Sequence, residues 1–262
     1  MDRRSGDALV VGVPREAFRP SILFLCLVGL TGTTAAMLWF GYGNAGLNAF
    51  GFVICGWLVT LCLHEYAHAL VAYRAGDVGV AERGYLTLNP LKYSHPLLSI
   101  VLPVVVVVLG GIGLPGGAVW VDRHHIPGRL RHTLVSAAGP VTNVIFAIGL
   151  SAPFALGMDA DTQADFWAAL ALLAFLQVTA SLLNLLPVPG LDGGNMIQPW
   201  LSAQWRRGYD LMAPYGFLLL FALLWDDRIG YWFFQAVFSV ADLIGLPAYR
   251  YAEGLDLIRF WS

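Results

Sequence analysis

The residues best suited to chemistry are two histidines and a glutamate in the pattern H-E-x-x-H, at His64, Glu65 and His68. If this segment is helical, side chains four residues apart share a face, so both imidazoles can reach one metal ion. Imidazole nitrogen is a common zinc ligand, and the glutamate can sit beside a water on the metal as general base. The pattern predicts one Zn²⁺ ion held by His64 and His68, with Glu65 as the catalytic base.

The metal needs a further ligand, because catalytic zinc commonly takes three protein ligands and a water, and Glu65 must stay free. Asp192 can supply it. This residue follows an apolar run and lies near Pro187, Pro189 and several glycines, which end a helix and form a turn. The alternative is that Asp192 only caps an ordinary exit turn. The histidine pattern favours Asp192 as the third ligand.

Two asparagines in apolar runs are candidates for handling a substrate. Asn184 can hydrogen-bond a developing oxyanion or orient a substrate backbone, so we predict a catalytic role for it. Asn143 follows the small residues Ala138 and Gly139, which allow close helix packing, and it is a candidate substrate-binding residue. For both asparagines the alternative is interhelical hydrogen bonding, which polar amides commonly provide within membranes.

Two further substrate-binding candidates lie in the segment after the H-E-x-x-H pattern. Residues 84–91 alternate weakly, like a strand whose exposed edge could pair with an unwound substrate. Asn89 belongs to this segment and His95 follows it, so we predict both as substrate-binding residues. A solvated basic loop explains the remaining histidines better than a metal site does: His124, His125 and His132.

Composition places these residues in a membrane protein. The chain is 58% hydrophobic and only 12% charged, about half the charged fraction of a soluble domain. The mean hydropathy is +0.67. The net charge of −2 and the lack of a basic stripe argue against nucleic acid as a partner, whereas a lipid bilayer is expected.

A membrane-spanning helix needs about 20 mostly apolar residues. Six runs meet or approach this length: 21–40, 49–72, 134–154, 166–187, 211–225 and 229–247. A seventh run, 96–114, contains a proline and a glycine-rich end, and the β-prone residues 118–121 after it could form an edge strand. We therefore expect an all-α polytopic membrane protein with about six transmembrane helices, a re-entrant segment, and short β-strands after the second helix.

The distribution of Lys and Arg decides how the run 96–114 is treated. If this run dips into the membrane and returns, and the N-terminus is cytoplasmic, all of the 15 Lys and Arg except Arg228 lie in cytoplasmic segments. A single crossing would divide them almost evenly. The positive-inside rule therefore favours the dip and places both termini in the cytoplasm. It also brings Asp192 level with the two histidines, near the cytoplasmic face.

Three motifs, found together and in this order, resemble the site-2 protease family of intramembrane zinc metalloproteases. They lie at 64–68 (HEYAH), 138–143 (AGPVTN) and 184–194 (NLLPVPGLDGG). The segment LTLNPL at 86–91, His95-Pro96 and the glycine-rich run before Ala118 resemble the compact bacterial branch without a PDZ domain. The resemblance covers roughly residues 50 to 200.

The resemblance implies a zinc ion held by two histidines and the aspartate of an L-D-G motif, with the glutamate as base and Asn184 near the scissile bond. It implies a single integral-membrane protease domain, 1–262, with a catalytic core of about 49–200, in a bacterial cell membrane. Family members cut transmembrane segments of other proteins, often anti-sigma factors or membrane-tethered regulators. One departure is Gly190, where relatives often have a proline.

The main alternative is a metal-binding membrane protein that does not cleave, either a transporter or a pseudo-protease scaffold. A transporter should spread polar groups over the depth of several helices, whereas here they cluster at one level. A pseudo-protease would be expected to lose Glu65, which is present. A haem or quinone protein would leave Glu65 without a task. The sequence makes no prediction of the oligomeric state.

Overall fold

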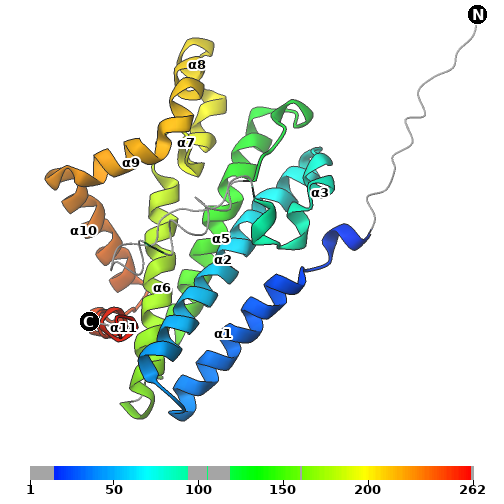
Figure 1. Ribbon diagram of the computed structural model, residues 1–262. Coiled ribbons are helices and arrows are strands. Elements are labelled where there is room, and N and C mark those ends of the chain that lie inside the picture. Colours follow the sequence, from blue (N-terminus) through cyan, green and yellow to red (C-terminus); the bar gives the residue numbers. More distant parts are fainter. Residues whose placement is uncertain (1–14, 94–104, 106–118, 160, 261–262) are drawn as a thin grey trace, which may run out of the picture.

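The computed structural model describes residues 15–93, 105, 119–159 and 161–260, and over these residues the protein is helical. Four long helices run side by side and form the bundle that carries the site (Figure 1). They are α1 (Ile22–Phe40), α2 (Ala45–Ala75), α5 (Arg129–Ala155) and α6 (Ala164–Leu185). Short 3₁₀ turns and the one-turn helix α3 (Gly79–Glu82) lie between them.

The ends of the first two long helices are set by capping residues. The Ser21 hydroxyl accepts a hydrogen bond from the Phe24 N–H, and the Asn44 side chain accepts one from the Leu47 N–H. These bonds satisfy N–H groups that have no partner within the helix. Gly41 ends α1 with a left-handed φ of 69°, which glycine adopts without strain. The turn between the helices is therefore short and defined.

Helix α6 is the centre of the bundle and the most buried of the long helices. It packs against α2 and α5 along its length. Trp57 of α2, Phe154 of α5 and Leu173 of α6 belong to the same buried apolar cluster. Because α2 and α5 both pack against α6, the side chains of α2 and α5 that face each other are brought close together.

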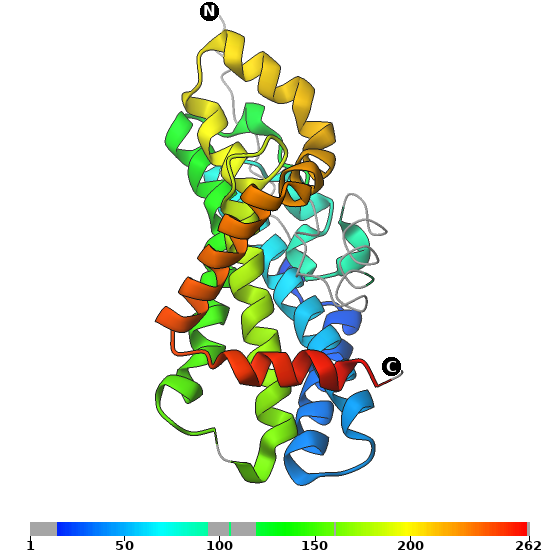
Figure 2. The same cartoon turned by 90° about the vertical axis from the view of Figure 1, so that its left-hand side faces the viewer.

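The C-terminal part is built from shorter helices: α7 (Asp192–Ile197), α8 (Ala203–Met212), α9 (Gly216–Trp225), α10 (Asp227–Leu243) and α11 (Ala248–Ile258). Helix α11 runs across α6 rather than along it (Figure 2). A Cβ added at Gly254 would lie 2.3 Å from the Ala168 carbonyl oxygen, so the two helices touch through backbone there. This crossing anchors the C-terminal helices to the bundle.

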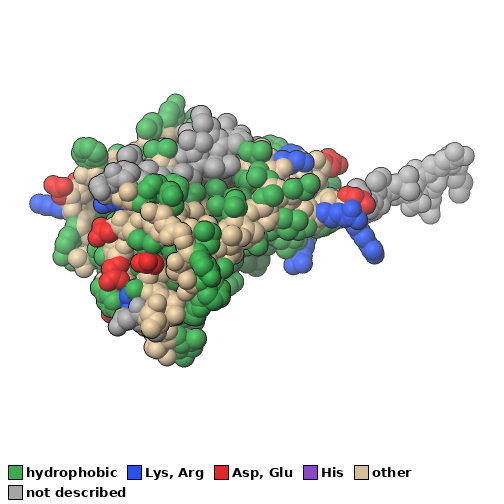
Figure 3. Space-filling view, turned by 60° about the horizontal axis from the view of Figure 1, so that its bottom comes forward, with side chains coloured by type: hydrophobic (Ala, Val, Ile, Leu, Met, Phe, Trp, Pro, Cys, Tyr) green, Lys and Arg blue, Asp and Glu red, His purple; other side chains and the backbone are tan. Residues whose placement is uncertain are grey.

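Five helical stretches within the described residues are long and apolar enough to cross a membrane, or six if α10 and α11 count as one bent span. Hydrophobic side chains cover much of the surface in Figure 3. The first four predicted spans coincide with α1, α2, α5 and α6. The fifth extends over Ala203–Trp225. The protein is therefore a polytopic membrane protein, as expected.

The last predicted span, 229–247, corresponds to α10, which ends at Leu243, and the chain bends only after it. Helices α10 and α11 meet at an angle of 113°. Gly245 between them has a φ of 76°, and Pro247 lacks a backbone N–H. A left-handed glycine followed by proline ends a helix, so the chain turns instead of continuing.

The predicted β-strands were wrong. Residues 84–91 contain two 3₁₀ turns, Tyr85–Thr87 and Pro90–Lys92, and Leu88 between them has a left-handed φ of 56°. Val119 to Val121, the described part of the other expected strand, forms no strand pairing. The predicted re-entrant run 96–114 lies outside the described residues, apart from Val105.

The two ends of the described chain lie at opposite ends of α2. Near the N-terminus, Phe18 packs edge-on against Tyr73 in the last turns of α2. Near the C-terminus, Leu257 and Phe260 approach Gly46 in the first turn of α2. This arrangement gives no support to the expectation that both termini lie on the cytoplasmic side, because α2 separates them by its whole length.

Candidate active site

The structure brings together three side chains from α2 and α7 that could hold a metal ion: His64, His68 and Asp192. The Nε2 atoms of His64 and His68 are 3.1 Å apart. The Oδ2 atom of Asp192 lies 3.2 Å from Nε2 of His64 and 3.4 Å from Nε2 of His68. The three atoms form a nearly equilateral triangle, and no other such group occurs among the residues that the structure describes.

This triangle fits zinc. With zinc–nitrogen and zinc–oxygen distances near 2.1 Å, tetrahedral geometry puts neighbouring ligand atoms about 3.4 Å apart. The three measured distances lie close to that value. Two imidazole nitrogens and one carboxylate oxygen form a typical ligand set for catalytic zinc, which also leaves a fourth position open.

The backbone of α5 lies directly beside the two imidazoles. A Cβ added at Gly139 would be 2.2 Å from Nε2 of His68 and 2.4 Å from Nε2 of His64. No side chain larger than hydrogen fits there without moving the imidazoles. The glycine therefore keeps free the space around the nitrogen atoms, on which metal binding depends.

A hydrogen bond to α5 fixes the ring orientation of His68. Its Nδ1 lies 2.6 Å from the Val135 carbonyl oxygen. Because a carbonyl can only accept, Nδ1 must carry the proton and Nε2 is left with a free lone pair. This tautomer directs the lone pair of Nε2 towards Asp192 and His64.

Glu65 lies next to the ligand triangle but is not part of it. It is only 2% exposed, and its Oε2 accepts a hydrogen bond from the Val119 N–H at 3.1 Å. Its Oε1 lies 3.9 Å from Nε2 of His64. One carboxylate oxygen is therefore held by the backbone, and the other faces the ligand triangle from beyond bonding distance.

Asp192 reaches the histidines because α7 begins tightly against the end of α6. Added Cβ atoms at Gly193 and Gly194 would lie 2.3 Å from the Leu185 carbonyl oxygen and 2.0 Å from the Val188 carbonyl oxygen. The carboxylate contacts the imidazoles and does not cap the turn.

The electrostatics of Asp192 favour its charged form. Burial alone would raise the pKa of the Asp192 carboxyl, but the adjacent imidazoles of His68 and His64 outweigh it and hold this pKa well below its ordinary value. An ionised carboxylate is the form in which aspartate binds a metal.

Gly190, where the family resemblance leads us to expect a proline, has a strict steric role. Its φ is 90°, and an added Cβ would lie 2.4 Å from the Ala213 carbonyl oxygen. Proline is confined to a φ near −65° and could not adopt this conformation. The sequence departure therefore belongs to a defined left-handed turn that carries the chain into α7.

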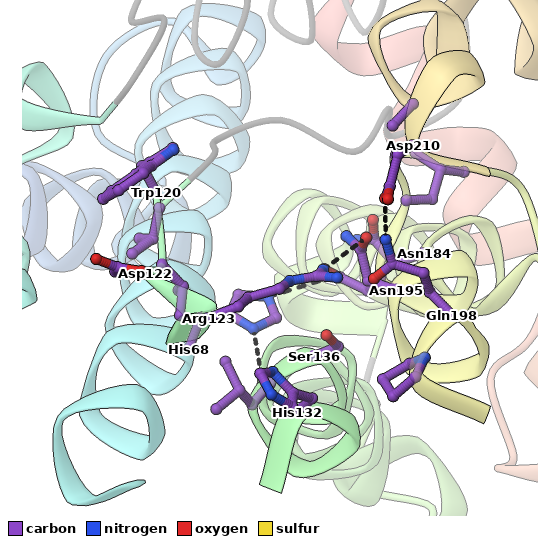
Figure 4. A pocket seen from close by; sticks show the side chains of 18 of the residues that line it. His68, Trp120, Asp122, Arg123, His132, Ser136, Asn184, Asn195, Gln198 and Asp210 are labelled. Carbon is purple, nitrogen blue, oxygen red and sulfur yellow. Dashed lines mark hydrogen bonds and ion pairs between the residues drawn. The ribbon is translucent and has the colours of Figure 1, made fainter. Parts of the chain in front are cut away.

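The ligand triangle lies at the wall of a cavity of about 770 Å³. Figure 4 shows Trp120, Asp122 and Arg123 on one side of it and Asn195, Gln198 and Asp210 on the other. Arg123 reaches across and donates to Asn195 Oδ1 at 3.0 Å, while Gln198 donates to Asp210. Polar and apolar groups both line the cavity, and the polar ones near the ligands allow water to be accommodated there.

Of the other predicted site residues that the structure describes, Asn184 lies at the cavity, and Asn143 and Asn89 do not. Asn184 lines the cavity together with the ligands. Asn143 is buried in α5 and is not among the cavity-lining residues. The Asn89 side chain accepts from the Leu91 N–H and caps a 3₁₀ turn, away from the cavity. His95 lies outside the described residues.

The remaining histidines of the described chain do not form a second metal group. His125 is exposed and pairs with Asp122 at 3.0 Å. His124 and His132 line the cavity together with the arginines Arg123 and Arg206. His124 and His125 belong to a short 3₁₀ turn, whereas His132 lies in the first turn of α5 and not in a loop.

The curated proteins to which this chain is similar are named as putative zinc metalloproteases. Two are called "Putative zinc metalloprotease Rip2": one of Mycolicibacterium smegmatis is 44% identical over 255 residues, and one of Mycobacterium tuberculosis is 45% identical over 252 residues. Each alignment covers 95% of this chain and 96% of the relative. YwhC of Bacillus subtilis, named in the same way, is 31% identical over 68% of this chain and 81% of its own length.

No protein-family model and no solved structure matches the chain. The near-complete coverage of the Rip2 relatives, together with the ligand group, nevertheless shows a zinc metalloprotease with Zn²⁺ as its cofactor. The chain belongs to the site-2 protease family of zinc metalloproteases, in its compact form.

Proposed function

We propose that this protein hydrolyses peptide bonds within membrane-spanning segments of other proteins. One observation carries the proposal: two of the three ligands lie on α2, a helix that can itself cross a membrane, and the ligand triangle lies at the wall of a cavity with charged and polar side chains in its lining. Hydrolysis needs water at the metal, while a membrane substrate must arrive through lipid. A site between spanning helices with a wet cavity serves both needs.

The depth of the site follows from its position on α2. This helix has 31 residues and is about 46 Å long, more than the roughly 30 Å of a bilayer core. His64 lies 19 residues after its start, about 29 Å along it. We propose that the cavity opens on the cytoplasmic side, where the positive-inside rule places the end of α2.

Each side chain has a proposed task. His64, His68 and Asp192 hold zinc, which supplies Lewis-acid chemistry by polarising a carbonyl oxygen and acidifying water. Glu65 takes a proton from the attacking water through Oε1 and passes it to the leaving amine. Asn184 donates its amide hydrogens to the substrate backbone or to the carbonyl oxygen as charge develops.

We infer that the substrates are single-pass or multi-pass membrane proteins, with anti-sigma factors and other membrane-tethered regulators as the first class to test. This class follows from the family resemblance. Peptide bonds in a helix are shielded by the helix's own hydrogen bonds, so a substrate must unwind locally before its carbonyl can reach the site. A cavity of about 770 Å³ leaves room for several extended residues.

The test uses the full chain reconstituted in liposomes with a panel of single-pass membrane segments that carry a tag at each end. Cleavage in H₂¹⁸O should place one ¹⁸O in the new carboxyl group, as mass spectrometry would show. Glu65→Gln should keep about one zinc per chain and lower the cleavage rate by about 10²- to 10⁴-fold, because it removes the base alone. Asp192→Ala should lose both zinc and cleavage.

Two results would count against this function. If wild type binds zinc but cleaves none of the segments, the non-proteolytic metal-binding alternative is favoured. If the Glu65→Gln protein cleaves at the wild-type rate, Glu65 is not the base and the assigned mechanism is wrong.

A further inference from the structure

Asp77 is a buried carboxylate outside the ligand group, directly after the glycine that caps α2. It is only 2% exposed, and burying a charged group is costly unless it is paired or hydrogen-bonded. Both of its oxygens are used: Oδ1 accepts from the Gly79 N–H at 3.0 Å and Oδ2 from the Asp122 N–H at 2.7 Å. Asp77 therefore ties the end of α2 to a segment 45 residues away.

Arg83 also links the end of α2 to the segment that contains Asp122. Its Nη1 lies 3.9 Å from Asp77 Oδ2 and donates to the Trp120 carbonyl oxygen at 3.4 Å. Its guanidinium carbon also lies 4.4 Å from the centre of the Trp120 ring, a cation–π contact. The segment Val119–Asp122, which we call the wall segment because all four residues line the cavity, is thus fixed at two points.

The other end of the wall segment reaches Glu65. The Val119 N–H donates to Glu65 Oε2, so the segment follows the last part of α2 from Glu65 to Asp77. None of these anchors is a neighbouring strand: the wall segment's backbone is bonded to side chains instead. If the segment moved, the carboxylate of Glu65 would lose the hydrogen bond that sets its rotation.

We propose that Asp77 is a positioning residue that, through the wall segment, holds Glu65 in the orientation it needs as a base. The proposal rests on the proposed function, because it assigns Glu65 a role in peptide hydrolysis. Asp77 does not touch the reacting atoms. Asp77 accepts a hydrogen bond from the Asp122 N–H and so holds one end of the wall segment in place. At the other end, the Val119 N–H binds Oε2 of Glu65, so that Oε1 is the oxygen that faces the ligand triangle.

The metal ligands are held by other contacts. His68 is oriented by the Val135 carbonyl of α5, and Asp192 by the close approach of α7 to α6. A loosened wall segment should therefore change the orientation of Glu65 while the ligand triangle survives. This separates a positioning role from a general loss of structure at the site.

The test is Asp77→Asn in the full reconstituted chain, with a membrane segment that wild type cleaves. Asparagine keeps one acceptor oxygen, but its amide group would face a backbone N–H, so one of the two hydrogen bonds is lost. The variant should keep one zinc per chain and a KM within about twofold of wild type, while kcat falls by about 10- to 100-fold. The matched control is Glu82→Gln, the same chemical change on an exposed residue of α3, which should behave like wild type.

A second variant tests the route. Val119→Pro removes the N–H that binds Glu65 and should also lower kcat. If Asp77 acts through this N–H, the double variant should be no slower than Val119→Pro alone, because two steps of one connection do not add. If the losses in kcat of the two single variants add in the double variant, the proposal is overturned. It is also overturned if Asp77→Asn loses zinc while the chains that still hold zinc turn over at the wild-type rate.

Hydrogen exchange provides a readout independent of cleavage. The amides of residues 119–123 should exchange faster in Asp77→Asn than in wild type and Glu82→Gln, and unchanged exchange would overturn the proposal. A wild-type protein that cleaves nothing would instead overturn the proposed function. The two failures are therefore distinguishable.

Discussion

Two kinds of residue decide the chemistry of the site: those that supply ligand atoms and those that leave room for them. His64, His68 and Asp192 supply three atoms at nearly equal separations. Gly139 supplies nothing, but it is the point where α5 comes within contact distance of both imidazoles. The arrangement of the ligands therefore depends on a missing side chain as much as on those present.

Gly139→Ala is the sharpest test at this scale. The added methyl group would overlap both imidazole nitrogens, so the rings must turn away, and zinc affinity should fall by about 10- to 100-fold. Gly149→Ala, on the same helix with open space around it, should bind zinc like wild type. Competition with a zinc chelator would measure both, and wild-type affinity in Gly139→Ala would contradict the assigned ligands.

The ligands could be predicted from the sequence because they follow either from the spacing of residues within one helix or from the number of ligands that zinc requires. The spacing of His64 and His68 follows from one helix, and the coordination needs of zinc demand a residue such as Asp192. The roles of Gly139, Asp77 and Val119 depend on contacts between segments far apart in the chain. A carboxylate directly after a helix-ending glycine was the only available signal for Asp77.

At the scale of elements, the turn between α6 and α7 delivers the third ligand. Gly190, Gly193 and Gly194 let three stretches of backbone approach within contact distance. A side chain at any of these positions would push α7 away from the end of α6 or from Ala213. The position of Asp192 is therefore a property of this turn as a whole.

Gly190→Ala should destabilise the protein and weaken zinc binding together. The left-handed φ of 90° costs alanine about 1–3 kcal/mol, before the clash with Ala213 is counted. Gly208→Ala, in α8 with open space, should be neutral or slightly stabilising. Thermal unfolding with and without zinc would compare them, and equal midpoints in both variants would show that the turn is not strained.

Secondary-structure elements could be predicted where the sequence pattern extends over many residues. The predictions were wrong where the pattern is short. The apolar runs of α1, α2, α5 and α6 are each about as long as a membrane crossing needs. The weak alternation over 84–91 covers too few residues, and the left-handed Leu88 and the cap formed by Asn89 turn the chain instead. A short alternating pattern does not distinguish a strand from consecutive turns.

At the scale of the whole molecule, α11 alters the charge argument made from sequence. Arg250 of α11 is buried and pairs with Asp159, in the loop between α5 and α6. That loop lies at the same end of the bundle as the α1–α2 turn (Figure 1). The C-terminal arginines therefore belong to the end of the molecule opposite Arg15, and the positive-inside bias is weaker than the sequence indicated.

Cysteine labelling from each side of the membrane would test this arrangement. In a chain with its three native cysteines replaced, Tyr42→Cys in the α1–α2 turn and Ala252→Cys in α11 should react with an impermeant maleimide from the same side. Gln204→Cys in α8, near the site, should react only from the other side. All three positions are exposed. Labelling of Ala252→Cys together with Gln204→Cys would place α11 at the wrong end and restore the cytoplasmic C-terminus that the charge pattern predicts.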